Sequence, residues 1–274
     1  MTLKNILQRT TSGIVYLVLV IGALFLGEFA YAFAFLTLGL LALHEFYRIS
    51  VSAGGCPMHV AGLSTGAAVF LISFGAASGL CSSAAWFMLP VLVIVLFVIA
   101  MFSGLPDVFR NLGITLLGLV YIILPLSTMN YLVFHTAGAM EYTHRIVLGI
   151  LILVWINDTG AFLAGITLGR HKLLPRISPK KSWEGAIGGM LLTLLASFWL
   201  SNIMGILNNM NWLILALIVS VFGVLGDLIE SMFKRSADVK DSGSLLPGHG
   251  GILDRIDSIL FVMPVSLVYL SVFL

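Results

Sequence analysis

The stretch GIVYLVLVIGALFLGEFAYAFAFLTLGLLAL, residues 13–43, contains a single charged residue, Glu28. A helix of about 20 apolar residues crosses a hydrocarbon core of about 30 Å. Similar runs recur along the whole chain, which is 59% hydrophobic and has a mean hydropathy of +1.09. A closed β-barrel would need alternating ten-residue segments, and these runs do not alternate. The sequence therefore predicts an all-α polytopic integral membrane protein whose residues 1–274 form a single transmembrane domain.

Glycine, proline and charged residues divide the apolar sequence into nine predicted transmembrane helices. They lie near 12–27, 29–46, 60–80, 86–102, 112–134, 146–167, 185–204, 212–231 and 255–273. Only Gly27-Glu28 separates the first two, so they form either a tight hairpin or one long tilted span. The N-terminus resembles a signal peptide, but apolar residues continue past Ala30-Tyr31-Ala32, which favours an uncleaved first span.

The basic residues favour one side of the predicted membrane. With nine spans, alternate loops collect Lys4, Arg9, Arg48, Arg110, the bases of 170–181, Lys234, Arg235 and Lys240. The opposite loops hold Arg145. The positive-inside rule then predicts a cytoplasmic N-terminus and a C-terminus on the opposite side.

Charge is concentrated in the second half of the chain, although only 9% of all residues are charged. Residues 1–150 are mostly an apolar scaffold half, whereas residues 155–260 carry most of the acids and bases and form the predicted catalytic half. The two cysteines, Cys56 and Cys81, have no metal-binding spacing and predict neither a disulfide framework nor a zinc site.

Acidic residues near the last two predicted helices share helix faces. Asp227, Glu230, Ser231 and Lys234 are spaced i, i+3, i+4 and i+7. Asp254 and Asp257 begin the last helix at i and i+3. Carboxylates at a membrane edge are costly unless they are paired or bind metal, and hard oxygen ligands suit Mg²⁺ carrying a polyphosphate. Simple ion pairs, such as Asp227 with Lys234, are the structural alternative.

The loop before the last helix reads Pro247-Gly248-His249-Gly250-Gly251. Glycine lets the backbone approach a ligand closely, and the N–H groups that follow lead into a helix N-terminus, a natural anion seat. A flexible loop is the alternative, but the flanking charged residues favour the binding hypothesis.

A second polar cluster spans 170–185 and includes the run Ser178-Pro-Lys180-Lys181-Ser182-Trp-Glu-Gly185. A basic patch on anionic lipid would explain its charge, whereas the mixed residue types favour a shaped anion site. Upstream, Asp158 lies inside a predicted span and is therefore a candidate functional residue, unless the helix breaks at Gly160. His44, Glu45 and Arg48 share one helix face at the cytoplasmic end of the second predicted span. This arrangement favours an interfacial ion pair over a catalytic role.

These motifs resemble those of phosphatidate cytidylyltransferases, the CDP-diacylglycerol synthases. Residues 231–257, SMFKRSADVKDSGSLLPGHGGILDRID, match that family's signature without departure. The 178–185 run resembles its SPKKTxEG element, with Ser182 in place of Thr. Asp158 with Gly160-Ala161-Phe162 resembles its D-x-G-A-[YF] element. In the first half of the chain, the resemblance to this family rests only on the pattern of transmembrane spans.

The resemblance implies a Mg²⁺-dependent reaction, with a second cation possible, in which CTP and phosphatidic acid give CDP-diacylglycerol and pyrophosphate at the cytoplasmic face. It also implies a homodimer, surrounded by membrane lipid and with no nucleic-acid partner, which lies in the inner (plasma) membrane if the source is bacterial. The attacking phosphate is already an anion, so the main barrier is charge repulsion between the substrates. Lysine, arginine and a divalent metal held by carboxylates can offset that repulsion, and the sequence supplies these residues.

Candidate roles follow for the charged and polar residues. The predicted metal ligands are Asp227 and Asp254, assisted by Asp257, Glu230 or Asp158. The predicted catalytic and phosphate-binding residues, beside Asp227 and Asp254, are Lys234, Arg235, Lys240, His249 and Arg255. The predicted substrate-binding residues are Ser178, Lys180, Lys181, Ser182, Ser231, Asp241, Gly250 and Gly251.

Other membrane functions fit less well. An ion-coupled transporter would place acids near mid-membrane on several broken helices, whereas these charges gather at one face. Another CDP-lipid enzyme, a CDP-alcohol phosphotransferase, would carry a D-x₂-D-G-x₂-A-R pattern, and no Asp-Gly dipeptide occurs. A P-loop is absent from the sequence.

Overall fold

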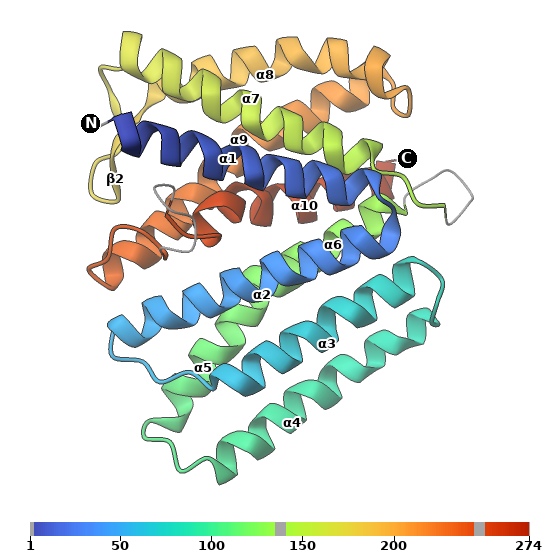
Figure 1. Ribbon diagram of the computed structural model, residues 1–274, viewed down its shortest axis with the longest axis vertical. Helices are drawn as coiled ribbons and strands as arrows, with labels where there is room; N and C mark the ends of the chain where they lie inside the picture. The colour runs from blue at the N-terminus through green and yellow to red at the C-terminus, as the bar shows by residue number, and fades with distance from the viewer. Residues whose placement is uncertain (1–2, 135–140, 244–249, 274) are drawn as a thin grey trace. The chain divides into compact units, whose positions relative to one another are not determined.

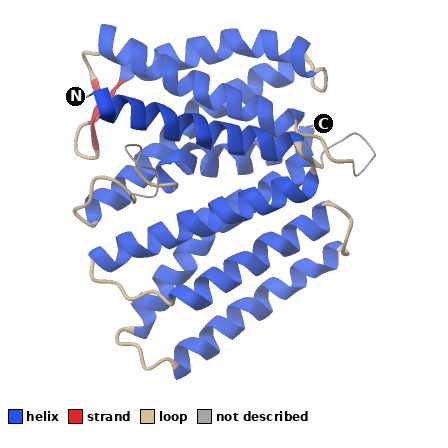
Figure 2. Cartoon of the chain, in the orientation of Figure 1, coloured by secondary structure: helices blue, strands red, loops and turns tan. Residues whose placement is uncertain are grey.

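The computed structural model describes residues 3–134, 141–243 and 250–273, and these residues are almost entirely helical (Figures 1 and 2). Within them, eight helical segments are long and apolar enough to cross a membrane. Their bounds are Glu28–Ser52 (α2), His59–Ala77 (α3), Ser83–Phe102 (a 3₁₀ turn and α4), Val108–Val133 (α5, a π turn and α6), Arg145–Leu168 (α7), Trp183–Met204 (α8), Asn209–Ser236 (α9) and Leu253–Phe273 (α10). Each corresponds to a predicted span, so the polytopic helical class is confirmed.

The first predicted span is also helical. The helix α1 covers Leu3–Phe25, and its apolar part, Thr11–Phe25, is shorter than the eight spans above. The chain turns between α1 and α2 at Gly27, whose φ of 110° is a conformation that L side chains rarely adopt. The predicted hairpin is therefore confirmed, and the alternative of one long tilted helix is wrong.

One span contains a π turn. The turn covers Leu119–Ile123, between α5 (Val108–Gly118) and α6 (Leu124–Val133). Pro125 lies two residues after its end and has no N–H to donate, and its ring crowds the carbonyl four residues earlier, inside the π turn. A widened turn accommodates this residue without ending the helix.

The chain divides into two compact units. The first consists of Met1–Tyr142 and Ser236–Ile256, and the second of Thr143–Arg235 and Asp257–Leu274. The 231–257 signature is therefore shared between the units. Its residues 236–256 belong with the N-terminal helices rather than with the rest of the predicted catalytic half.

Polar contacts join the helices of the first unit. Tyr31 on α2 donates its hydroxyl hydrogen to Asn130 Oδ1 on α6 at 3.0 Å, and Tyr47 donates to the carbonyl of Thr115 at 2.9 Å. Such bonds help to hold transmembrane helices together, because in lipid the hydrophobic effect does not drive apolar helices to associate. On α4 (Met88–Phe102), the buried residues are Leu96 and Ala100, and large apolar side chains face outward, which suits a lipid-facing helix.

In the second unit, α7 and α8 run side by side (Figure 1). Small residues form their contact: a Cβ at Gly160 would lie 3.1 Å from the Cα of Gly189. Asn157 and Thr193, both buried, add a hydroxyl-to-amide bond of 3.4 Å. The alternative of a helix break at Gly160 is wrong, because α7 continues through it to Leu168.

A short antiparallel hairpin precedes α8. Its strands are Lys172–Leu174 (β1) and Ser178–Ser182 (β2). This hairpin is the only β-sheet among the described residues and lies outside the predicted all-α fold class.

Candidate active site

Helices α9 and α10 approach each other closely in the second unit. A Cβ at Gly226 would overlap the backbone carbonyl of Asp257, so only glycine fits there without a shift. Gly223 lies one turn before Gly226 on α9, and its carbonyl accepts the hydroxyl hydrogen of Ser258 at 3.1 Å. This close contact brings the acids that follow Gly226 next to Asp257.

Three carboxylates meet at this contact. Asp227, Glu230 and Asp257 each offer an oxygen within 4.8 Å of the others, a spacing that can hold a metal ion. Glu230 and Asp257 are buried, whereas the Asp227 side chain is 37% exposed. The cluster therefore has two buried members and one that opens outward, and the sequence predicted all three as metal ligands.

Two lysines form ion pairs with two of the three carboxylates. Lys181 Nζ lies 2.6 Å from Asp227 Oδ2, and Lys234 Nζ lies 2.7 Å from Glu230 Oε2. Ser231 donates to Asp227 Oδ1 at 3.2 Å. The structural alternative had paired Asp227 with Lys234, but Asp227 is paired with Lys181 from the other polar cluster. The SPKKSWEG run and the acidic residues of α9 are thus in contact.

The β-hairpin positions Lys181. Ser182 begins α8 by accepting the Gly185 N–H at 3.1 Å, an N-cap bond. The Glu184 carboxylate reaches back to the backbone N–H groups of Arg170 and His171, each at 3.1 Å, and to the His171 ring. Glu184 was not among the predicted site residues. Its position in the first turn of α8, after the N-cap Ser182 and next to a basic loop, could have indicated this role.

The remaining predicted residues of the second unit lie at its surface or in the hairpin. Asp158 is exposed on α7 and is not a member of the three-carboxylate group among the described residues. Ser178 and Lys180 are on β2, and Arg235 Nε donates to the carbonyl of Ile177 at 3.5 Å. The signature arginine therefore contacts the hairpin.

In the first unit, Asp254 contacts the chain that leads to α10. Its Oδ2 accepts hydrogen bonds from the backbone N–H groups of Gly251 at 2.8 Å and Ser242 at 3.2 Å, and lies 2.9 Å from Ser242 Oγ. Asp254 is not in the three-carboxylate group. These contacts with Ser242 and Gly251 fix the loop before α10.

Glu45 lies in the same cluster, on α2. Its side chain is buried and accepts the backbone N–H groups of Ile252 and Leu253 at 3.0 and 2.9 Å. The predicted interfacial ion pair is therefore wrong for Glu45: the carboxylate binds backbone, and Arg48 is exposed. The predicted anion seat also needs correction, because Glu45 and Asp254 together take the N–H groups of residues 251–253.

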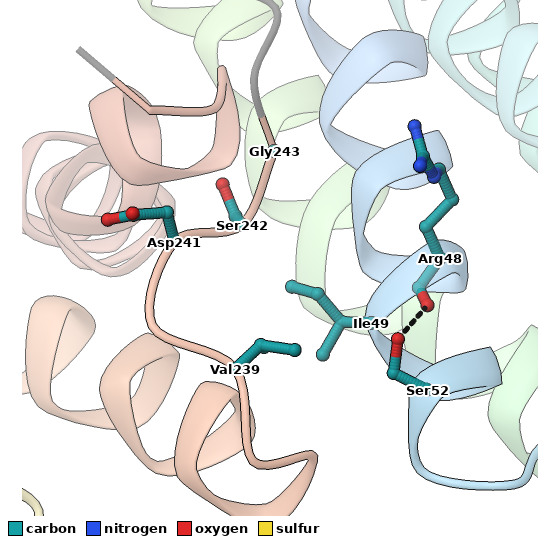
Figure 3. A pocket seen from close by; sticks show the side chains of 7 residues that line it. All are labelled: Arg48, Ile49, Ser52, Val239, Asp241, Ser242 and Gly243. Carbon is teal, nitrogen blue, oxygen red and sulfur yellow. Dashed lines mark hydrogen bonds between the residues drawn. The ribbon is translucent and has the colours of Figure 1, made fainter. Parts of the chain in front are cut away.

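A cavity of about 210 Å³ lies beside this cluster (Figure 3). Arg48 and Ser52 of α2 lie across it from Asp241 and Ser242. Its lining residues are Arg48, Ile49, Ser52, Val239, Asp241, Ser242 and Gly243. The predicted substrate-binding residue Asp241 is exposed here.

Three of the remaining predicted signature residues lie within the described part of the chain. Lys240 and Arg255 are exposed. Gly250 has a φ of 87°, which favours glycine. His249 lies outside the described residues.

The sequence profile of the cytidylyltransferase family matches residues 7–273. The chain belongs to this family. It is similar to phosphatidate cytidylyltransferases of Staphylococcus aureus strain COL, at 54% identity over 127 residues, and of Staphylococcus saprophyticus, at 50% over 129 residues. Each alignment covers 45% of this chain and 48% of the relative. The matched chain thus spans about half the length of these curated relatives.

Together with the eight membrane-length helices, the bacterial relatives identify this cytidylyltransferase family member as a multi-pass protein of the inner (plasma) membrane. The resemblance predicted from the two motifs is confirmed at the level of the family.

The donor set of the second unit suits a hard divalent cation. Asp227, Glu230 and Asp257 supply carboxylate oxygens only, which Mg²⁺ prefers over nitrogen or sulfur ligands. Lys181 and Lys234 form ion pairs with two of these acids.

Proposed function

We propose that this protein is a phosphatidate cytidylyltransferase, which converts CTP and phosphatidic acid to CDP-diacylglycerol and pyrophosphate at the cytoplasmic face. The observation that carries the proposal is the contact of two motifs at one place. Lys181 of the SPKKSWEG run is bonded to Asp227, which lies beside Glu230 and Asp257. The family membership and the names of the relatives support the same activity.

The reaction joins two anions. An oxygen of the phosphatidic acid phosphate forms a bond to the α-phosphorus of CTP, and the bond from that phosphorus to the bridging oxygen of the β-phosphate breaks. Pyrophosphate leaves with the electron pair. Because the attacking oxygen is already negatively charged, no strong general base is needed, and the protein must mainly position two polyanions and offset their charge.

We assign the divalent cation, Mg²⁺, to Asp227, Glu230 and Asp257, with Asp254 and Asp158 as the further ligands predicted from sequence. When bound, the cation would neutralise phosphate charge and orient the reacting oxygens. Lys181 and Lys234 hold their ammonium groups beside these carboxylates, within reach of phosphates brought to the same acids. Arg235, Lys240, His249 and Arg255 remain the proposed further cationic residues.

The substrates come from different phases. Phosphatidic acid lies in the leaflet and CTP in water, so the site has to lie at the membrane surface. The basic hairpin with Ser178 and Lys180 extends from the membrane-length helices α7 and α8, which suits a lipid phosphate or a triphosphate there. A homodimer is part of the proposal through the family resemblance alone.

The direct test uses the purified protein in lipid nanodiscs with radiolabelled CTP, phosphatidic acid and Mg²⁺. The expected result is a labelled product that partitions into organic solvent, together with an equal amount of pyrophosphate. The matched control replaces phosphatidic acid by diacylglycerol, which lacks the attacking phosphate. If label enters lipid equally with both substrates, or with neither across a range of lipid and salt conditions, the proposed reaction is wrong.

A further inference from the structure

Glu45 has an unusual position for a charged side chain in a membrane protein. It lies in the C-terminal third of α2, it is 2% exposed, and it accepts the N–H groups of Ile252 and Leu253, where α10 begins. A third donor, the Ser242 hydroxyl, lies 3.1 Å from Oε2. All four residues belong to the first unit.

The bonds explain how this buried carboxylate is tolerated. A charge without partners costs several kcal/mol or more when it is removed from water. The N-terminus of a helix offers orphan N–H groups and a positive partial charge, and Glu45 uses two of these groups. Most helices receive such a cap from a residue next to the N-terminus, whereas the cap of α10 comes from more than 200 positions away.

A cap from a distant helix fixes a position as well as a conformation. A local cap would move with α10, but Glu45 moves with α2. The start of α10 is therefore attached to α2 by two charge-assisted bonds, which are shorter and stronger than neutral ones.

The glycines of the signature segment are packed against the same carboxylate. A Cβ at Gly251 would overlap Glu45 Oε2 and Ser242 Oγ, and a Cβ at Gly243 would overlap Glu45 Oε1. Asp254 closes the cluster, since its Oδ2 accepts from Gly251 and Ser242. Gly243 and Gly251 of the signature thus leave room for Glu45, whereas Gly250 leaves room for Asp254.

The Ser242 hydroxyl has one hydrogen and two carboxylate neighbours, Glu45 at 3.1 Å and Asp254 at 2.9 Å. It can donate to one of them at a time. Glu45 and Asp254 are therefore linked through a shared serine.

We propose that Glu45 is a positioning residue for the signature segment: it holds the start of α10, and with it Asp254, in the arrangement that the reaction requires. Its effect on catalysis rests on the proposed cytidylyltransferase activity. Its effect on the position of α10 does not.

The test compares Glu45→Gln with Glu28→Gln. Both remove one negative charge from α2, but Glu28 is at the other end of the helix. In Glu45→Gln, the amide NH₂ replaces one of two oxygens that each face a backbone N–H, so at least one bond becomes a donor–donor contact. The first readout is hydrogen–deuterium exchange of residues 250–256, which needs no substrate. The second is kcat and KM for CTP, corrected for the folded fraction.

For Glu45→Gln, we expect exchange at residues 252 and 253 to rise about tenfold, as the loss of one charge-assisted bond implies. We expect kcat to fall by about tenfold to a hundredfold, with little change in KM for CTP, because misplacement of the site affects the reacting geometry. Glu28→Gln should match the wild type in both readouts.

Unchanged exchange would overturn the positioning of α10. Faster exchange with a wild-type kcat would overturn the catalytic part, because it would leave Glu45 as a cap only. If the wild type itself has no CTP-dependent activity, the proposed function fails, and faster exchange in Glu45→Gln would still support the attachment of α10 to α2.

Discussion

The close approach of α9 and α10 at Gly226 gives the sharpest test of the carboxylate cluster. In Gly226→Ala, the new Cβ would lie 3.1 Å from the carbonyl carbon of Asp257 and from the Cα of Ser258, and closer still to the Asp257 oxygen. Nearly all real Cβ contacts are longer than these. Because the atoms it meets are backbone, the helices have to separate.

The expected magnitude combines two opposing terms. Overpacking a tight contact costs about 1–3 kcal/mol, and replacing glycine by alanine inside a helix gains about 1 kcal/mol. Gly226→Ala should therefore be destabilised by roughly 0–2 kcal/mol. Its CTP-dependent activity should fall by about tenfold to a hundredfold, because Asp227 and Asp257 move apart. This loss should exceed the loss of folded protein that the destabilisation causes.

The matched control is Gly223→Ala, one turn earlier on α9. Its Cβ would lie 3.7 Å from the Cβ of Ser258, an ordinary contact. This variant should gain up to about 1 kcal/mol of stability and keep its activity. Thermal unfolding and initial rates with labelled CTP measure both variants. If Gly226→Ala is as active and as stable as Gly223→Ala, α9 and α10 do not set the carboxylate spacing.

Three further predictions concern single side chains of the second unit. Asp227→Asn should insert and fold normally but lose nearly all CTP-dependent activity, as measured by product formation in nanodiscs, and near wild-type turnover would remove it from the metal site. Lys181→Ala should raise the KM of one substrate in steady-state kinetics, because it loses an ammonium group beside the cluster; unchanged constants for both substrates would place it outside the site. Glu184→Gln should release the β-hairpin and speed tryptic cleavage after Arg170 or Lys172, and an unchanged cleavage rate would show that other contacts hold the hairpin.

The helices could be predicted from the sequence because lipid imposes a strong and local requirement. Every stretch that crosses it has to satisfy its backbone internally and to be apolar over a membrane thickness. The Gly27 hairpin was also predictable, since a glycine between two apolar runs is a local signal. The cluster of Asp227 and Glu230 followed from helical spacing alone.

The partners of these residues could not be predicted in the same way. Lys181 contacts Asp227, and Glu45 contacts Leu253, through the packing of segments far apart in the chain. Spacing along one helix carries no information about which distant segment lies opposite. Glu45 was assigned to an interfacial ion pair for this reason: it has charged neighbours in sequence, whereas its partners are backbone amides of another helix.

The hairpin of β1 and β2 was missed because its strands are short, basic and contain Pro179, all of which disfavour strands in general. Here the Glu184 carboxylate stabilises the hairpin by accepting the backbone N–H groups of Arg170 and His171. This contact cannot be seen in the strand preferences of the residues themselves.

The glycine contact between α7 and α8 has a consequence for biogenesis. These two helices are consecutive in the chain and their backbones meet through small residues, so they carry their association surface within one continuous stretch of chain. They can pair in the bilayer as soon as both have entered it, without contacts from α9 or α10. A bulky residue at Gly189 would therefore act during assembly: it would leave this helix pair open to quality-control proteases even where the finished protein tolerated the change.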